Sequence, residues 1–105
     1  MSTPRIEIPQ DAINGFCRKW KITEFAFFGS VVRDDFGPDS DIDVLVAFHH
    51  DARHTLFDLV HMEDELREIF GRDVDLVTRK AVERNPSEWR RNAILGSLLH
   101  VAVAS

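Results

Sequence analysis

Two aspartates open an apolar stretch near the middle of the chain. Asp41 and Asp43 flank Ile42, and apolar residues continue from there as far as Phe48. Such a run is typical of a buried β-strand, in which alternate side chains point to the same face. Two like charges on one face of a strand are unfavourable without a compensating partner. The pattern therefore predicts a strand over residues 41–48 and a polar site at its first residues.

The residues before this strand predict a helix, a second strand and a turn. Apolar side chains recur at helical spacing over residues 11–20, and the aromatic run at residues 24–28 is typical of a short buried strand. That strand stops at Gly29, after which a short helix is expected over residues 31–35. Residues 36–40 are dense in turn formers and predict a loop.

A longer helix is expected over residues 55–70. Thr55 is a suitable cap at its start, and Gly71 is a suitable stop after its end. Its expected apolar face consists of Leu56, Leu59, Val60, Leu66, Ile69 and Phe70. The opposite face, with His54, Asp58 and His61 at helical spacing, is expected to be solvated, and a zinc site there is set aside.

The last part of the chain predicts a strand and a helix. Residues 73–77 are typical of a third strand, and a final helix is expected from residue 86 to about residue 102, with Asn85 as its cap. Apolar residues run nearly all the way round this helix, which indicates either an exposed partner surface, compatible with a homo-oligomer, or an unusually buried terminal helix. The full order of elements is that of an α/β fold with a small sheet.

Composition limits the classes of protein that the chain can represent. Its 105 residues favour a single domain over residues 1–105. The net charge of −5 argues against an extended nucleic-acid surface. The sequence contains no apolar run of membrane-spanning length and no secretory signal, so a cytoplasmic protein is expected. Cys17, the only cysteine, is expected to be a core thiol.

Three aspartates can converge if the second and third predicted strands are neighbours. Asp41 and Asp43 project from one face of the second strand, and Asp75 lies midway along the third. Carboxylates of this kind suit Mg²⁺, and two such ions can assist phosphoryl transfer. Asp73 would share a face with Asp75 and is an alternative third ligand, although Asp75 lies deeper in the strand.

A phosphate cradle is expected at the turn after the first strand. Gly29 permits close approach of the backbone, and Ser30 offers a hydroxyl at the start of a short helix, where free N–H groups favour anions. Arg33, one turn later, can add charge to the same phosphates. Together with the aspartates, this turn predicts a nucleotide site.

The spacing of these residues resembles a known signature. Gly29-Ser30, a gap of ten residues, and Asp41-Ile42-Asp43 resemble the motif of the DNA polymerase β-like nucleotidyltransferases. Within them the chain most resembles the minimal nucleotidyltransferases (MNT), which are often paired with a HEPN-domain protein. The resemblance runs from about residue 25 to residue 78, and includes Arg33 and Asp75.

The resemblance implies a mixed sheet flanked by helices and an Mg²⁺-dependent transfer of a nucleoside monophosphate. Asp41, Asp43 and Asp75 would bind two Mg²⁺ ions, and Asp75 would help to deprotonate the acceptor. Gly29, Ser30 and Arg33 would hold the phosphates of ATP. The implied acceptor is a hydroxyl of a HEPN-type toxin, with the chain acting as its antitoxin.

Two other functions remain open. The first is a non-catalytic antitoxin that neutralises its partner by occlusion, for which Asp34 and Asp35 leave room because they add negative charge beside the phosphate turn. The second is a transferase acting on a small molecule or an RNA end, against which the acidic net charge argues in the case of RNA.

Overall fold

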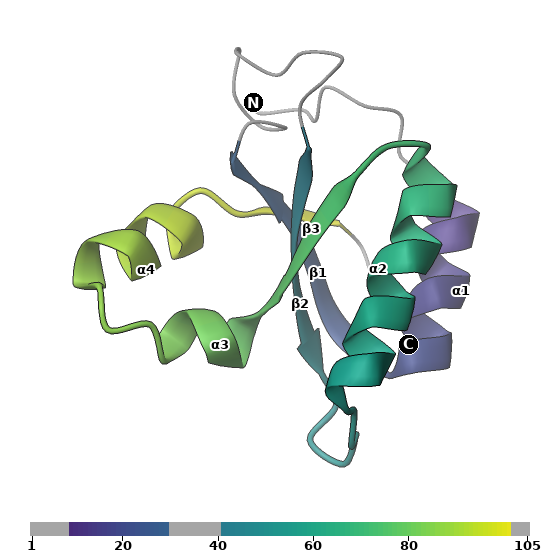
Figure 1. The fold of residues 1–105 in the computed structure, drawn as a ribbon, viewed down its shortest axis with the longest axis horizontal. Helices are drawn as coiled ribbons and strands as arrows, with labels where there is room; N and C mark the ends of the chain where they lie inside the picture. Colours follow the sequence, from purple (N-terminus) through teal and green to yellow (C-terminus); the bar gives the residue numbers. More distant parts are fainter. Residues whose placement is uncertain (1–8, 30–40, 102–105) are drawn as a thin grey trace.

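A mixed four-stranded sheet forms the centre of the structure, a computed structural model that describes residues 9–29 and 41–101 (Figure 1). The strands are β1 (Ile22–Phe28), β2 (Ile42–Phe48), β3 (Val74–Thr78) and β4 (Leu99–Val101). Their order in the sheet is β3-β2-β1-β4. The β2/β3 pair is parallel, whereas β1 is antiparallel to both β2 and β4. The three strands expected from the sequence are confirmed, and a fourth is added.

Two helices cover one face of the sheet. Helices α1 (Gln10–Trp20) and α2 (Leu56–Phe70) lie together on the same side in Figure 1, and α2 is the crossover between the parallel strands β2 and β3. The core beneath them is a cluster of buried side chains from all of these elements. It comprises Ile13, Phe16, Cys17, Ile22, Phe25, Phe27, Ile42, Val44, Val46, Met62, Leu66 and Val74.

The alternation expected along the second strand is confirmed. Ile42, Val44 and Val46 are fully buried and belong to the core under the helices. Because successive side chains of a strand point to opposite faces, Asp43 and Leu45 belong to the other face. The burial of three apolar anchors fixes the register of β2 and so fixes the direction in which Asp43 points.

Both expected ends of α2 are confirmed, but part of its expected apolar face is wrong. Thr55 and Asp58 form a reciprocal capping box, and Gly71 ends the helix with φ of 72°. Leu56 and Val60 are 79% and 57% exposed rather than buried. Both residues lie on the flank of the helix that carries Glu63, not on the flank of Met62 and Leu66, which faces the core.

The single C-terminal helix expected over residues 86–102 is also wrong. The structure instead has a short helix α3 (Arg79–Glu83), a second helix α4 (Glu88–Leu95) and strand β4. Ser87 caps α4 by accepting a hydrogen bond of 3.2 Å from the backbone N–H of Arg90. Asn85 instead accepts a hydrogen bond of 2.9 Å from the N–H of Ser87.

The partner surface expected on a C-terminal helix is not formed, because residues 99–101 belong to strand β4. Leu99 and Val101 pack against the core, and β4 pairs with β1 through Phe27 and Phe25 respectively. Of the large apolar side chains in residues 86–101, Trp89 is the one left strongly exposed. Within the described parts of the chain, no helix is long and apolar enough to cross a bilayer.

Candidate active site

Asp43 and Asp75 stand side by side on the face of the sheet away from α1 and α2. They are register partners on the parallel strands β2 and β3, and neighbouring strands lie about 4.8 Å apart. Residues in register on adjacent strands point to the same face. Asp43 is half-buried and Asp75 is exposed. The fold therefore brings together two of the three predicted carboxylates, from positions far apart in the sequence.

Gly29 packs its backbone directly against the carboxylate of Asp43. It follows Phe28, the register partner of Asp43 at the end of β1, and has φ of 70°. A Cβ atom at Gly29 would lie 2.3 Å from Oδ2 of Asp43 and 3.2 Å from its Cγ. This position therefore requires glycine both for its left-handed backbone and for the space that the Asp43 carboxylate occupies.

Asp41 lies at the entrance to β2, and Asp73 lies just before β3. Asp41 is exposed, and the N–H of the next residue, Ile42, donates a hydrogen bond of 3.0 Å to the carbonyl oxygen of Asp73. The Asp73 side chain is 80% exposed and lies 3.8 Å from Nε of Arg67. Asp75, not Asp73, is the neighbour of Asp43 in the sheet, so the geometry favours Asp75 as the third carboxylate.

The donor chemistry at Asp43 and Asp75 fits Mg²⁺. Adjacent carboxylates are hard oxygen donors, and Mg²⁺ is usually held by one or two of them together with substrate phosphates. Over residues 9–29 and 41–101, no three His, Cys, Asp or Glu side chains are arranged as a metal-ligand group. Ser30, Arg33, Asp34 and Asp35, together with the predicted short helix and loop at 31–40, lie outside the described residues.

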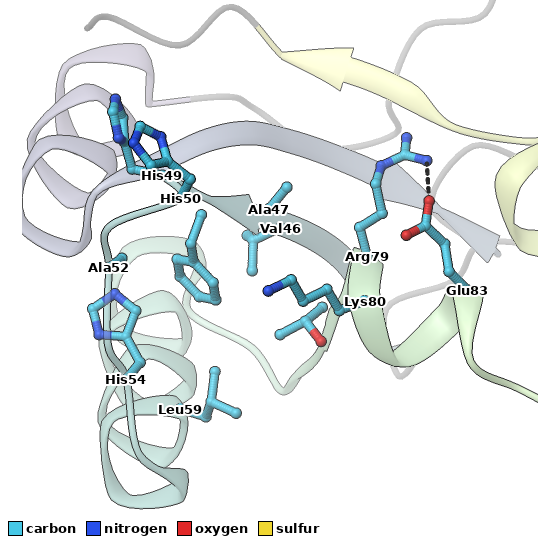
Figure 2. Close-up of a pocket in the computed structure, with 12 residues that line it drawn as sticks. Val46, Ala47, His49, His50, Ala52, His54, Leu59, Arg79, Lys80 and Glu83 are labelled. Carbon is cyan, nitrogen blue, oxygen red and sulfur yellow. Dashed lines mark ion pairs between the residues drawn. The ribbon is translucent and has the colours of Figure 1, made fainter.

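His54 is a structural residue and not part of a solvated face, so that prediction is wrong. Its side chain is 15% exposed. Its ring packs edge-on to those of Trp20 and Phe48, with centroids 5.7 and 4.6 Å away. Nε2 of His54 lies 2.7 Å from the carbonyl oxygen of Trp20. His54 also lines a hollow at the end of the sheet remote from Asp43 (Figure 2). His61 is exposed, as expected.

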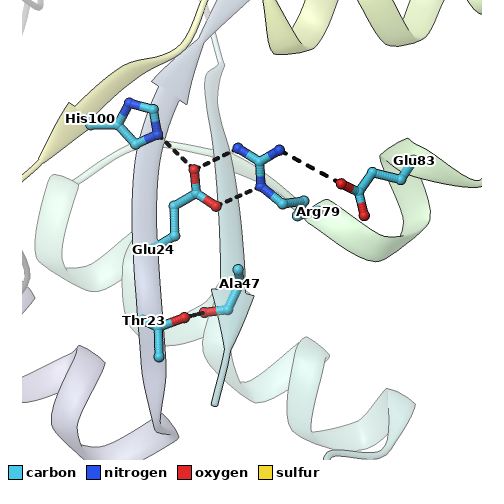
Figure 3. Close-up of polar contacts among 6 residues, drawn as sticks. All are labelled: Thr23, Glu24, Ala47, Arg79, Glu83 and His100. Carbon is cyan, nitrogen blue, oxygen red and sulfur yellow. Dashed lines mark hydrogen bonds and ion pairs between the residues drawn. The ribbon is translucent and has the colours of Figure 1, made fainter. Parts of the chain in front are cut away.

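A polar network on the same face as Asp43 was not predicted from the sequence. Glu24 of β1 receives two hydrogen bonds from Arg79, of 2.6 and 2.7 Å, and its Oε2 lies 2.6 Å from Nε2 of His100 (Figure 3). The hydrogen bonds from Arg79 lower the pKa of Glu24 to about 2, with His100 adding to this effect and burial opposing it. The sequence offered one signal, an acid in a strand, but its partners lie 55 and 76 residues away.

The network joins three elements across the sheet. Glu24 is opposite Ala47 in the register of β1 and β2, four residues along β2 from Asp43. Arg79 opens α3 directly after β3, and His100 belongs to the edge strand β4. The ion pair of Glu24 and Arg79 therefore secures the far end of the strand that carries Asp75, while Glu24 and His100 secure β4 to β1.

The mixed sheet with carboxylates on adjacent parallel strands fits a nucleotidyl-transfer domain, and sequence comparison places the chain in a family. Residues 10–96 match the family described as nucleotidyltransferase domain. A chain of Methanocaldococcus jannaschii assigned as a protein adenylyltransferase is 34% identical over 83 residues, or 79% of this chain and 80% of that one. The chain belongs to the nucleotidyltransferase domain family and is a nucleotidyltransferase.

Solved structures share the same architecture. A structure described as a minimal nucleotidyltransferase is 27% identical, has a TM-score of 0.67 and matches over 88% of each chain. A complex of a tri-AMPylated HEPN toxin from Shewanella oneidensis with an MNT antitoxin is 20% identical with a TM-score of 0.60. That match covers 90% of this chain and 70% of the other, and it supports the fold. The mixed sheet with flanking helices is thus the minimal nucleotidyltransferase fold.

Proposed function

We propose that the chain transfers AMP from ATP to a hydroxyl group of a HEPN-type toxin and acts as its antitoxin. The observation that carries this proposal is the placement of Asp43 beside Asp75, with the backbone of Gly29 against the Asp43 carboxylate. This geometry puts adjacent carboxylates next to a glycine turn, which is what a site for a metal-bound triphosphate requires. The names of the relatives, a protein adenylyltransferase and an MNT antitoxin bound to an AMPylated toxin, support the same reaction.

Each predicted site residue has a role in this proposal. Asp41, Asp43 and Asp75 would hold two Mg²⁺ ions, which supply charge stabilisation to the phosphates and to the attacking oxygen. Gly29 and Ser30 would hold the outer phosphates through backbone N–H groups and the serine hydroxyl, and Arg33 would add positive charge. Asp75 would also accept the proton of the acceptor hydroxyl.

The covalent step is a substitution at the α-phosphate of ATP. The acceptor oxygen forms a bond to the α-phosphorus while the bond between this phosphorus and the bridging oxygen to the β-phosphate breaks. Pyrophosphate leaves, and the proton of the hydroxyl passes to the carboxylate of Asp75. The product is an AMP group in phosphodiester linkage to the partner.

A non-catalytic antitoxin is the second candidate. One feature of the sequence favours it, because Asp34 and Asp35 follow the glycine turn and add negative charge near the expected phosphate site. In that case the chain would neutralise its partner by covering it, and the aspartates would have no catalytic role.

The decisive experiment measures transfer of AMP to the purified product of the adjacent reading frame, which we expect to be a HEPN-domain protein, with ATP and Mg²⁺ and with intact-mass detection. Asp43→Asn replaces a charged carboxylate with a neutral amide that binds a metal ion less well. We expect at least a 100-fold loss of the transfer rate (about 2.7 kcal/mol). Asp73→Asn is the matched control, because Asp73 is a nearby exposed acid that is not in register with Asp43. Its rate should stay within about twofold of wild type.

The outcomes separate the two candidate functions. Transfer that persists in Asp43→Asn would overturn the roles given to the aspartates. A tight complex without any transfer by the wild-type chain would favour the non-catalytic antitoxin.

A further inference from the structure

A hollow of about 510 Å³ lies at the carboxyl ends of β2 and β3 (Figure 2), whereas Asp43 and Asp75 lie near the amino ends of these strands. Phe48 and Thr78, the last residues of the parallel strands β2 and β3, line it together with Leu59 of α2 and Lys80 of α3. The carboxyl ends of parallel strands are a recurrent place for binding crevices. The lining residues nearest to the aspartates, Val46 and Thr78, are each three residues further along their strands than Asp43 and Asp75, or about 10 Å of extended strand, so this hollow is separate from the paired carboxylates.

An exposed apolar surface adjoins the hollow on α2. Leu56, Phe57 and Val60, here named the α2 patch, are 79%, 80% and 57% exposed. Leu59 points into the hollow, and Leu56, three positions before it, is its neighbour on the helix surface. Val60 neighbours Leu56 and Phe57 at spacings of four and three, so the patch extends from Leu56 round the helix to Phe57. Of the large apolar side chains that residues 9–29 and 41–101 leave strongly exposed, all but Trp89 belong to this patch. Clustered exposure of this kind marks an interaction surface.

The charged side chains among the described lining residues are Arg79, Lys80 and Glu83, and Arg79 is already paired with Glu24. Lys80 points into the hollow in Figure 2, and no acidic side chain in the described ranges pairs with it. Glu83, the one acid among the described lining residues, already faces Arg79 at 3.8 Å. The surface therefore complements a partner that presents apolar side chains together with a carboxylate.

We propose that the hollow and the α2 patch form the docking surface for the HEPN-type partner, which presents an apolar segment carrying an Asp or Glu for Lys80. This inference rests on the proposed function, because it names the surface that holds the acceptor protein. A ligand small enough to enter the hollow would leave the side chain of Phe57 exposed to solvent. A protein segment can cover both the hollow and the α2 patch, so a protein partner fits this surface better. Docking in a hollow that begins about 10 Å along the strands from the aspartates leaves the carboxylates open for ATP and places the acceptor hydroxyl within reach of them.

Binding is measured apart from catalysis, by titration calorimetry of the purified chain with the product of the adjacent reading frame, the expected HEPN-domain protein. We expect Leu56→Gln/Phe57→Gln to weaken the dissociation constant at least tenfold, through the loss of two exposed apolar contacts. Lys80→Glu, which reverses the charge in the hollow, should also weaken it at least tenfold.

Helix α4 provides matched controls. Trp89 is 79% exposed and is the second residue of its helix, as Phe57 is of α2. Arg90, an exposed residue of α4, allows the same change of charge as Lys80. Trp89→Gln and Arg90→Glu should each bind within about twofold of wild type. Circular dichroism and thermal melting of all variants verify that each chain is folded.

Transfer rates distinguish failure of this inference from failure of the proposed function. In the α2 variant, the concentration of partner that gives half-maximal transfer should rise about tenfold while the maximal rate stays unchanged. If the wild-type chain binds the partner but transfers no AMP, the proposed reaction is overturned. The docking surface is still supported in that case, provided that the α2 and Lys80 variants lose binding. Variants that bind and transfer as wild type overturn the docking surface alone.

Three further results would overturn the docking surface. The first is the absence of any binding between the wild-type chain and the HEPN-domain protein. The second is a dimer of the isolated chain, seen by light scattering, that dissociates in Leu56→Gln/Phe57→Gln. The third is sedimentation with vesicles of phosphatidylserine and phosphatidylcholine that depends on Phe57.

Discussion

At the scale of single residues, the carboxylate of Asp43 occupies the space that a side chain at Gly29 would need. Gly29 has φ of 70°, and Oδ2 of Asp43 occupies the position next to its missing Cβ, at 2.3 Å. A methyl group there would displace the carboxylate or shift the turn. The glycine thus has a positioning role toward Asp43 in addition to the contact with phosphates that its place in the motif predicts.

Gly29→Ala should therefore lower AMP transfer more than it lowers stability. We expect at least a tenfold loss of transfer rate, and about 1–2 kcal/mol of stability lost to the left-handed backbone. Gly71→Ala is the matched control, because Gly71 has φ of 72° but no atom within 4 Å of its Cβ position. It should lose similar stability in urea denaturation and keep its transfer rate. Equal loss of activity in both variants would contradict the positioning role.

The sequence predicted individual residues well where a local pattern determined them. Alternation along two short strands predicted which face Asp43 and Asp75 would share if the strands were neighbours, and the cap at Thr55 followed from one side chain. That β2 and β3 do pair is shown by the structure. The burial of His54 was missed because it depends on Trp20 and Phe48, which reach it from α1 and β2. Such contacts arise from tertiary packing and leave no periodic signal in the sequence.

At the scale of elements, the ion pair of Glu24 and Arg79 links β1 to the start of α3. Glu24 has a pKa near 2 instead of 4.5, chiefly because Arg79 donates two hydrogen bonds to its carboxylate. A lowered pKa means that the folded state favours the charged carboxylate. This stability is present above pH 4.5 and is lost as the pH falls through about 2.

Glu24→Gln should remove this part of the pH dependence. We expect the variant to be about 2 kcal/mol less stable than wild type near pH 6, and this difference to shrink toward zero as the pH falls to about 2. Urea denaturation at a series of pH values measures it. Glu83→Gln is the control, since Glu83 is 54% exposed and 3.8 Å from the same arginine, and it should change stability by less than about 0.5 kcal/mol. A constant difference between wild type and Glu24→Gln at all pH values would contradict the role of the charge.

The elements that the sequence predicted wrongly share a physical cause. Residues 86–102 contain apolar side chains at helical spacing, yet the chain leaves α4 after Leu95 and returns as β4. Strand β4 exists because Leu99 and Val101 pair with Phe27 and Phe25, more than 70 residues earlier. A three-residue edge strand and a five-residue helix such as α3 are too short to show a period of their own.

At the scale of the whole molecule, the two faces of the sheet carry different groups. One face carries the core under α1 and α2, and the other carries Asp43, Asp75 and the Glu24 network. The core anchors the strands, so that the polar face can hold charged groups in fixed register. A triphosphate with Mg²⁺ bound on that face would contact β2, β3 and the turn after β1, and would favour the folded state over the unfolded one.

AMP-PNP and Mg²⁺ together should therefore raise the melting temperature of the whole domain. At 100 times the dissociation constant, a ligand specific for the folded state adds about 2.7 kcal/mol, which for a domain of this size corresponds to a rise of about 10 °C or more. Either component alone should give a much smaller shift, because in the proposed site the carboxylates and the phosphates would share the metal. Differential scanning fluorimetry measures the effect. Asp73→Asn should keep the shift and Asp43→Asn should lose it, whereas an equal rise in Asp43→Asn would place the nucleotide away from the paired aspartates.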